Sequence, residues 1–352
     1  RNRLPARTAM ESRVTVRSKQ PGIIHFSQST QRGAPRGLDD IPVVLEKWTC
    51  RFVYRDQICP IPRSAGLRHM VNRAIIVVPV HRSCPTPNER IGLRHLGRLM
   101  AERPILLVSP QTIETHAYRR LLPNACDLKV PPRWMESIRA YNRMMISPMI
   151  YNHRLLRGYS HMLLHEPDAV LLKDELDHWS TEPYDFIGSP WTRVDADALA
   201  GVALCQGANG GLSLTNLAAM RWVTSSWLRW HSWRHVFGDL YCGLVERNLP
   251  KLRRGLVAAY PGGLLRGAYR LYNTGWDIFF TSLVPSLLPE FRVAPPNVCV
   301  RFGWETGTYA CKLYNNGDPP FGLHAWTKYE PALMLELMQS MGVDCSGYEP
   351  AS

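Results

Sequence analysis

The stretch His161-Met162-Leu163-Leu164-His165-Glu166-Pro167-Asp168-Ala169-Val170-Leu171-Leu172 decides the fold. Two short apolar runs flank a polar turn that carries two carboxylates. Runs of this length suit buried strands, and a proline such as Pro167 is poorly tolerated inside a helix. The stretch therefore predicts a strand, an acidic turn and a second strand. In an open α/β sheet, ligands bind beyond the carboxyl ends of the strands, which is where we expect Asp168.

The two carboxylates of this turn, Glu166 and Asp168, suit a hard divalent cation that also holds phosphate oxygens. Taken alone, they fit an ordinary acidic surface turn equally well, because Glu and Asp are common turn residues. A zinc site on His161 and His165 is disfavoured. Met162 stands where a metalloprotease helix carries Glu, and the segment is predicted to be a strand.

The region before this stretch predicts one βαβ unit. Residues 74–80 form a β-branched run typical of a central strand. Thr86 can cap a helix, Pro87 fits its first position, and Glu89 completes a capping box. Residues 104–109 predict the next buried strand. A strand, a helix and a strand in so short a span are normally parallel and right-handed.

The remaining elements are predicted from spacing and breakers. In chain order they are a helix over 133–147 that Pro148 breaks or kinks before a second helical piece ending near Gly158, a short strand turning into a loop over 185–191, a small-residue segment over 206–211, a helix from Leu217, a loose excursion over about 230–272, a helix over 273–288, a strand over 298–303 and a helix over 331–341.

Composition and charge restrict the class of protein. The 352 residues, 45% of them apolar, can bury the core of one large α/β domain or two smaller ones. The first 73 residues hold 14 basic and 5 acidic side chains, so most of the net charge of +13 belongs to them. These arginines form no tight block and no regular pattern with aromatic residues. We therefore expect a poorly ordered basic arm over 1–72, and a nucleic-acid-associated protein is only an alternative.

The cysteines and the hydropathy bear on the compartment. Nine cysteines are scattered and never spaced as Cys-x-x-Cys, which argues against a zinc ribbon or a dense disulfide framework. They favour a reducing compartment, so we expect a cytoplasmic location. No apolar stretch reaches the roughly 18 residues that a membrane span needs.

Several stretches, taken in order, resemble a known family. They are Val77-Val78-Pro79-Val80 with Pro85-Thr86-Pro87 and Glu89-Arg90, Ser137-Ile138 with Tyr141-Asn142-Arg143-Met144-Met145, Asp168-Ala169 with Asp174-Glu175-Leu176, Tyr184-Asp185-Phe186-Ile187-Gly188 with Pro190-Trp191, Asn209-Gly210-Gly211 with Ser213-Leu214, Asp277-Ile278-Phe279, and Pro320-Phe321-Gly322 with His324-Ala325-Trp326. Over about 74–330 the chain resembles the family known as domain of unknown function 5672, which is similar to glycosyltransferases of the A-type fold.

The resemblance implies a fold and an activity. The fold is a single α/β, Rossmann-like domain over 73–330 with a mostly parallel central sheet, followed by a C-terminal helix and tail over 331–352. The implied activity is transfer of a sugar from a nucleotide-sugar donor to a hydroxyl acceptor, either a glycan or a lipid-linked one. Mn²⁺ or Mg²⁺ would assist by neutralising the leaving diphosphate.

The resemblance also assigns residues to roles. The donor would be bound by Val80, His81, Arg82, Asn142, Arg143, Asn209, Gly210 and Gly211; the metal by Glu166, Asp168 and His324; the acceptor or the sugar by Trp191 and Trp326; and the acceptor proton by Asp277. Three of these assignments also have a purely structural interpretation. His324 fits a buried core histidine, Asp277 a helix start, and the segment 209–211 a tight turn.

This sequence departs from the family pattern at two positions. Glu166 replaces the first aspartate of the usual Asp-x-Asp metal motif, and Trp276 stands before Asp277 where the family tends to carry an acidic residue. The second departure weakens the case for Asp277 as a base. A catalytically impaired member that binds a nucleotide sugar or a glycan is therefore a further alternative.

Overall fold

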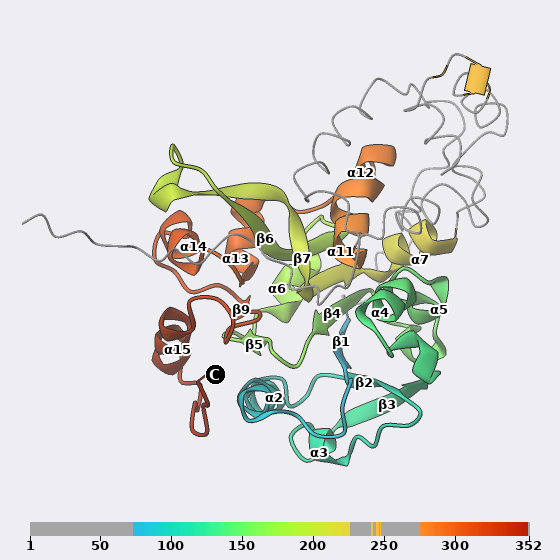
Figure 1. The fold of residues 1–352 in the computed structure, drawn as a ribbon. Helices are drawn as coiled ribbons and strands as arrows, with labels where there is room; N and C mark the ends of the chain where they lie inside the picture. Colours follow the sequence, from blue (N-terminus) through green and yellow to red (C-terminus); the bar gives the residue numbers. More distant parts are fainter. Residues whose placement is uncertain (1–72, 226–240, 242–243, 246, 248–274, 351–352) are drawn as a thin grey trace, which may run out of the picture. The chain divides into compact units, whose positions relative to one another are not determined.

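The computed structural model describes residues 73–225 and 275–350, with 241, 244, 245 and 247 between them (Figure 1). The basic arm expected over 1–72 lies outside the described residues, as does most of the excursion expected over 230–272.

The central sheet has six strands in the order β3-β2-β1-β4-β7-β6. Their bounds are β1 Ala74–Pro79, β2 Ile105–Pro110, β3 Ala125–Val130, β4 His161–His165, β6 Phe186–Val194 and β7 Val202–Asn216. Strands β1 to β4 are mutually parallel, whereas β7 runs antiparallel to both of its neighbours. The α/β class and the mostly parallel sheet are thus confirmed.

The βαβ unit forms as the sequence predicts. Strand β1 pairs with β2 in parallel, and helix α2, Pro87–Leu99, connects them. Thr86 caps this helix by accepting from the backbone N–H of Glu89, whose carboxylate accepts in turn from the N–H of Thr86. This reciprocal capping box satisfies two amides that a helix start leaves without partners.

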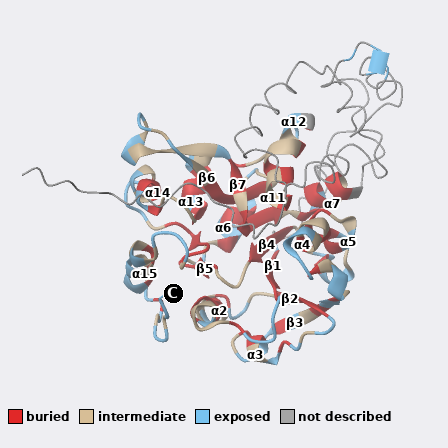
Figure 2. Ribbon diagram, viewed as in Figure 1, coloured by how far each residue is buried: buried red, intermediate tan, exposed pale blue. Residues whose placement is uncertain are grey.

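Short helices surround the sheet. They are α3 His116–Arg119, α4 Ile138–Met145, α5 Pro148–Tyr151, α6 Leu176–Thr181, α7 Leu217–Ser225, α11 Trp276–Ile278, α12 Val284–Leu287, α13 Pro296–Phe302, α14 Thr308–Tyr314 and α15 Pro331–Ser340, with 3₁₀ turns at Pro132–Trp134, Arg154–Leu156 and Leu199–Gly201 and a π-helical turn at Phe279–Leu283. Figure 2 shows the central strands buried and the outer helices exposed on one side. Among the described residues, no helix has the length and apolar character to cross a bilayer.

A second, three-stranded sheet lies beside the carboxyl edge of the first. It has the order β5-β9-β8, with bounds Val170–Leu171, Gly322–Leu323 and Gly303–Trp304. Its apolar side joins α15 in a separate hydrophobic cluster that includes Val170, Leu323 and Trp304. The predicted strand, acidic turn and strand are therefore β4, the turn at Glu166 to Ala169, and β5, and they connect the two sheets (Figure 1).

Two predicted elements differ from the structure. The strand expected over 298–303 is helix α13, which begins at Pro296 and passes into β8 only at Gly303. A short apolar run does not distinguish a buried helix from a strand, and Pro296 at the first helical position favoured the helix. The helix expected over 133–147 begins later, because Ser137 caps α4 by accepting from the N–H of Ala140.

Candidate functional site

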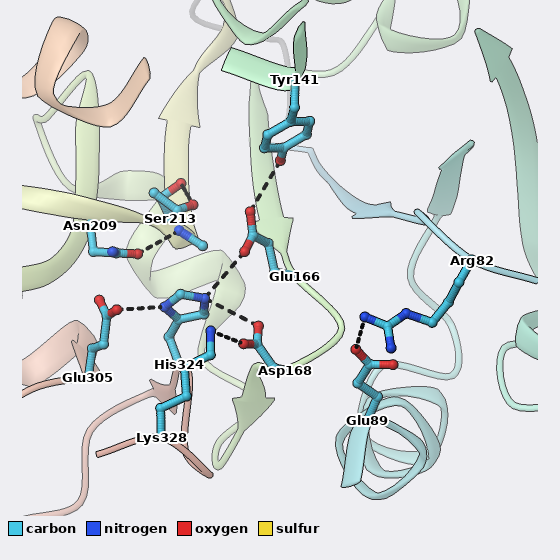
Figure 3. A network of polar contacts seen from close by, with 12 residues as sticks. Arg82, Glu89, Tyr141, Glu166, Asp168, Asn209, Ser213, Glu305, His324 and Lys328 are labelled. Carbon is cyan, nitrogen blue, oxygen red and sulfur yellow. Dashed lines mark hydrogen bonds and ion pairs between the residues drawn. The ribbon is translucent and has the colours of Figure 1, made fainter. Parts of the chain in front are cut away.

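The carboxyl edge of the sheet carries a cluster of Glu166, Asp168 and His324 (Figure 3). The Nε2 atom of His324 lies 3.4 Å from Oε2 of Glu166 and 3.3 Å from Oδ1 of Asp168. One ligand atom from each residue falls within 4.8 Å of the others, a span that one divalent cation can bridge. His324 is 156 positions from Asp168 and 158 from Glu166 in the sequence, yet the three predicted metal residues are neighbours in space.

The strand pairings explain this convergence. Strand β4 delivers Glu166 at its carboxyl end, where the N–H of Glu166 donates to the carbonyl of Gly211 at 2.8 Å. The turn places Asp168 just before β5, and β5 pairs antiparallel with β9, whose next residue is His324. Each of the three side chains thus follows or precedes a buried strand, so its position is fixed by the hydrogen bonding of the sheets.

The cluster has further polar neighbours that the sequence did not assign to the site. Lys328 Nζ lies 3.1 Å from Oδ2 of Asp168, and Oε1 of Glu305 lies 3.4 Å from Nδ1 of His324. The hydroxyl of Tyr141 donates to Oε1 of Glu166 at 3.3 Å. The contacts of Tyr141 and Lys328 could not be predicted from local sequence, because their partners are 25 and 160 positions away.

Charge and burial set the protonation of the cluster. Burial of the His324 ring lowers its pKa, but the charge of Glu305 and contacts with Asp168 and Glu166 outweigh it and hold the pKa well above 6.5. Burial raises the pKa of Asp168, but His324 and Lys328 hold it well below its ordinary value. Without a metal, the cluster is therefore a network of carboxylates around an imidazolium.

The residues present fit a divalent metal. Within the described part of the chain, both ring nitrogens of His324 are buried without a well-aligned hydrogen bond, although three carboxylates surround the ring. Two carboxylate oxygens and one imidazole nitrogen form a donor set that suits Mn²⁺. A cation bound here would replace the proton on Nε2, since a metal ligand must be deprotonated.

The glycine pair of the segment 209–211 makes room for protein side chains. The segment lies within β7 rather than in a turn, at a bulge where Gly188 pairs with Ser213 but Pro190 pairs with Ala208. A Cβ on Gly210 would overlap the Trp276 ring, and one on Gly211 would overlap the His324 ring. The Asn209 side chain accepts from the Gly211 N–H at 2.7 Å.

The other predicted donor residues take different positions. Val80 is fully buried, and His81 lies edge-on to the Tyr141 ring at 5.3 Å. Arg82 lies 3.8 Å from Glu89. The Asn142 side chain accepts from the backbone N–H of Trp276 at 3.4 Å, so it holds the start of α11. The Nε atom of Arg143 is buried and has no hydrogen-bond partner among the described residues.

Of the two tryptophans predicted to contact a sugar, one is part of the core. Trp326 is fully buried and packs 5.6 Å from the Tyr348 ring, so in this structure it has no free face for a sugar. The reason is the second hydrophobic cluster, which the sequence did not reveal. Trp191 is partly exposed and lies over Gly207, whose φ of +110° favours glycine.

Asp277 lies against the bulge of β7. A Cβ added to Gly210 would lie 3.1 Å from the Cβ of Asp277. Its Oδ1 accepts from the N–H of Ile278 at 2.8 Å. Burial, aided by the charge of Glu305, raises the pKa of Asp277 to about 6. The charge of Glu305, which lies 3.4 Å from Nδ1 of His324, therefore acts on the carboxylate predicted as a base as well.

The sequence comparison identifies the family. A profile of the family described as "Protein of unknown function (DUF5672)" matches residues 127–324, more than half of the chain. The chain belongs to this family. The match contains Glu166, Asp168, Asp277, Glu305 and His324. The DUF5672 region therefore includes all three residues of the cluster. No curated protein matches the chain significantly.

Solved structures similar to this DUF5672 chain are glycosyltransferases. Galactosyltransferase LgtC, solved with donor and acceptor sugar analogues, is 12% identical with a TM-score of 0.42, over 76% of this chain and 95% of LgtC. Mouse xyloside xylosyltransferase 1 is 11% identical with a TM-score of 0.38, over 72% and 96%. Core-mannan synthase A from Aspergillus fumigatus, in its Mn/GDP form, is 13% identical with a TM-score of 0.32, over 45% of this chain and 62% of that protein.

Proposed function

We propose that this protein transfers a sugar from a nucleoside-diphosphate donor to a hydroxyl acceptor, with Mn²⁺ or Mg²⁺ held by Glu166, Asp168 and His324. The observation that carries the proposal is the convergence of these three side chains at the carboxyl edge of a mostly parallel sheet. This edge is where ligands bind in open α/β sheets. The resemblance to the A-type glycosyltransferases implies the same reaction.

The residues around the cluster suit a diphosphate. Lys328 has a side chain that is 60% exposed, so its ammonium can reach a phosphate oxygen while it stays near Asp168. Tyr141 is buried beside Glu166, and both features keep the phenol neutral and a donor that orients this carboxylate. A metal bound here would neutralise the charge that develops on the leaving diphosphate.

Asp277 is the candidate base for the acceptor hydroxyl. Its pKa of about 6 leaves most of it ionised at neutral pH, and a carboxylate in this state can accept a proton as the hydroxyl attacks. It lies beside the bulge of β7, and the charge of Glu305, which contacts His324, acts on it. We therefore place the acceptor on the side of the bulge and the diphosphate on the side of Lys328.

A second candidate is a donor-binding protein with little or no transferase activity. Trp276, next to Asp277, is buried and packs between Phe186 and Phe280. It therefore supplies no second carboxylate at the position where the family tends to have one. Hydrolysis of the donor with and without Mn²⁺ separates the candidates, because only an enzyme releases free sugar above the uncatalysed rate.

A thermal-shift panel tests the proposal. Nucleoside diphosphates and their sugars are added with Mn²⁺ to the wild-type protein, to Asp168→Ala and to Asp174→Ala, which removes a half-exposed carboxylate paired with Arg103. Stabilisation by one donor in the wild type and in the Asp174 variant, but not in the Asp168 variant, supports it. Equal shifts in all three proteins would exclude a metal-dependent donor site at Asp168.

A further inference from the structure

Glu305 lies behind His324, on the side away from the other two carboxylates (Figure 3). The pairing of the second sheet puts it there. Strands β8 and β9 are parallel with Trp304 opposite Leu323, and the N–H of His324 donates to the carbonyl of Trp304 at 2.9 Å. Glu305 is the first residue after β8 and His324 is the first residue after β9, so the two lie side by side.

The two nitrogens of the His324 ring face different partners. Nδ1 lies 3.4 Å from Oε1 of Glu305, whereas Nε2 faces Glu166 and Asp168. The side chain of Glu305 is only 13% exposed, so water screens the contact little. A neutral imidazole carries one proton, and the nitrogen without it holds the lone pair that a metal needs.

We propose that Glu305 is a positioning residue that keeps the proton of His324 on Nδ1 and so presents the lone pair of Nε2 to the metal. The inference rests on the proposed function, because it assumes a metal between Glu166, Asp168 and His324. A carboxylate that accepts from the second ring nitrogen fixes both the tautomer and the orientation of a ligating histidine. Glu305 is the described carboxylate that lies against Nδ1.

The same position links the metal cluster to Asp277. The charge of Glu305 acts on both His324 and Asp277. Loss of Glu305 therefore affects a ligand on one side and the candidate base on the other. For this reason transferase activity alone does not test the positioning role, and direct readouts of the metal and of the ring are needed.

The test compares Glu305→Ala and Glu305→Gln with the wild type. Mn²⁺ affinity is measured from the electron paramagnetic resonance signal of the free ion. The tautomer of His324 is read from two-bond ¹H–¹⁵N correlations of the metal-free protein, at a pH at which its imidazole is neutral, with His324→Gln to assign the signal. Glu182→Ala is the matched control, since it breaks a His–Glu pair with His178 outside the site. Circular dichroism confirms that each variant is folded.

We expect Glu305→Ala to weaken Mn²⁺ binding about 10- to 100-fold and to shift His324 toward the Nε2–H tautomer. Glu305→Gln keeps a carbonyl oxygen that accepts from Nδ1–H, so it should retain most of the affinity and the wild-type tautomer. Unchanged affinity and tautomer in Glu305→Ala would overturn the positioning role while leaving the metal site intact. A wild type that binds no Mn²⁺ would instead overturn the proposed function, and the tautomer of the metal-free protein would still decide the role of Glu305.

Discussion

Gly211 and His324 lie so close that only a hydrogen atom fits between them. A Cβ on Gly211 would overlap Nε2 and Cε1 of the imidazole and lie 2.6 Å from its Cδ2. The carbonyl of Gly211 also accepts from the N–H of Glu166 at 2.8 Å. The strand that carries the glycine therefore sets the positions of two of the three proposed metal ligands, Glu166 and His324.

Gly211→Ala should displace His324 and weaken Mn²⁺ binding by at least about 10-fold, close to the effect of removing the imidazole itself. Isothermal titration of each variant with Mn²⁺ measures this. Gly97→Ala is the control, because its Cβ would collide with the carbonyl of Leu121 in a part of the fold remote in sequence from the cluster. If both variants bind Mn²⁺ as the wild type does, the glycine has no role in placing the ligand.

Lys328→Met should weaken binding of a nucleoside diphosphate about 10-fold or more, because a hydrogen bond to a charged group is worth about 1.5–3 kcal/mol. Binding of Mn²⁺ alone should stay the same or strengthen, since the ammonium that lies 3.1 Å from Asp168 competes with the metal for its charge. Titration of each ligand separately resolves the two effects.

The control for this prediction is Lys173→Met, a lysine whose ammonium donates to the carbonyl of Pro319 and lies near Glu175. It should leave both affinities unchanged. Parallel loss of metal and diphosphate binding in Lys328→Met would show that Lys328 acts on the structure of the cluster and not on the diphosphate.

The sequence predicted the part of this arrangement that depends on local pattern. The apolar runs on both sides of Glu166-Pro167-Asp168 predicted β4 and β5, and the capping box at Thr86 predicted the start of α2. The carboxyl end of β4 then followed as the place for a ligand, because parallel strands share one edge. These features need only neighbours along the chain.

The other features of the site depend on contacts between residues that are distant in the sequence, and no local pattern predicts these contacts. Glu305 is adjacent to His324 only because α13 ends where β8 begins, and the sequence predicted a strand in place of α13. Trp326 looked available for a sugar because the cluster formed by β5, β8, β9 and α15 could not be read from spacing. Edge strand β3 was not predicted, since Asp127 and Lys129 interrupt its apolar residues.

Asp277→Asn should abolish transfer if Asp277 is the base, and the wild-type rate should rise with pH until the carboxyl group, with its pKa of about 6, is ionised. The stability of the wild-type fold should change in the opposite direction and fall as the pH rises. Because the folded-state pKa is above the ordinary 3.8, the unfolded chain loses its proton first, and the protein loses stability as the pH rises from about 4 to about 6.

Asp277→Asn should therefore raise the free energy of unfolding at pH 7.5 by up to about 3 kcal/mol, since one pKa unit is worth about 1.4 kcal/mol. Urea unfolding at pH 4 and pH 7.5 measures the difference. Asp318→Asn serves as the control, because Asp318 is exposed and follows the turn at 315–317. An Asp277→Asn protein that transfers sugar at the wild-type rate would assign the proton to another group.

His161 provides a prediction about stability that is independent of the cluster. It is the first residue of β4, only 6% exposed, and its Nδ1 lies 3.0 Å from the hydroxyl of Ser160. Burial lowers its pKa from 6.5 to about 4. The folded protein thus holds this ring neutral, whereas the unfolded chain takes up a proton below pH 6.5.

It follows that the protein loses stability as the pH falls from about 6.5 to about 4, by up to about 3 kcal/mol from His161 alone. His161→Gln cannot take up this proton, so its free energy of unfolding should decline less over the same range. Urea unfolding at pH 7 and pH 4.5 gives the difference, with the exposed His116→Gln as the control. Equal declines in the wild type and in His161→Gln would mean that the ring is already protonated in the folded state, and that the β4 start tolerates a charge.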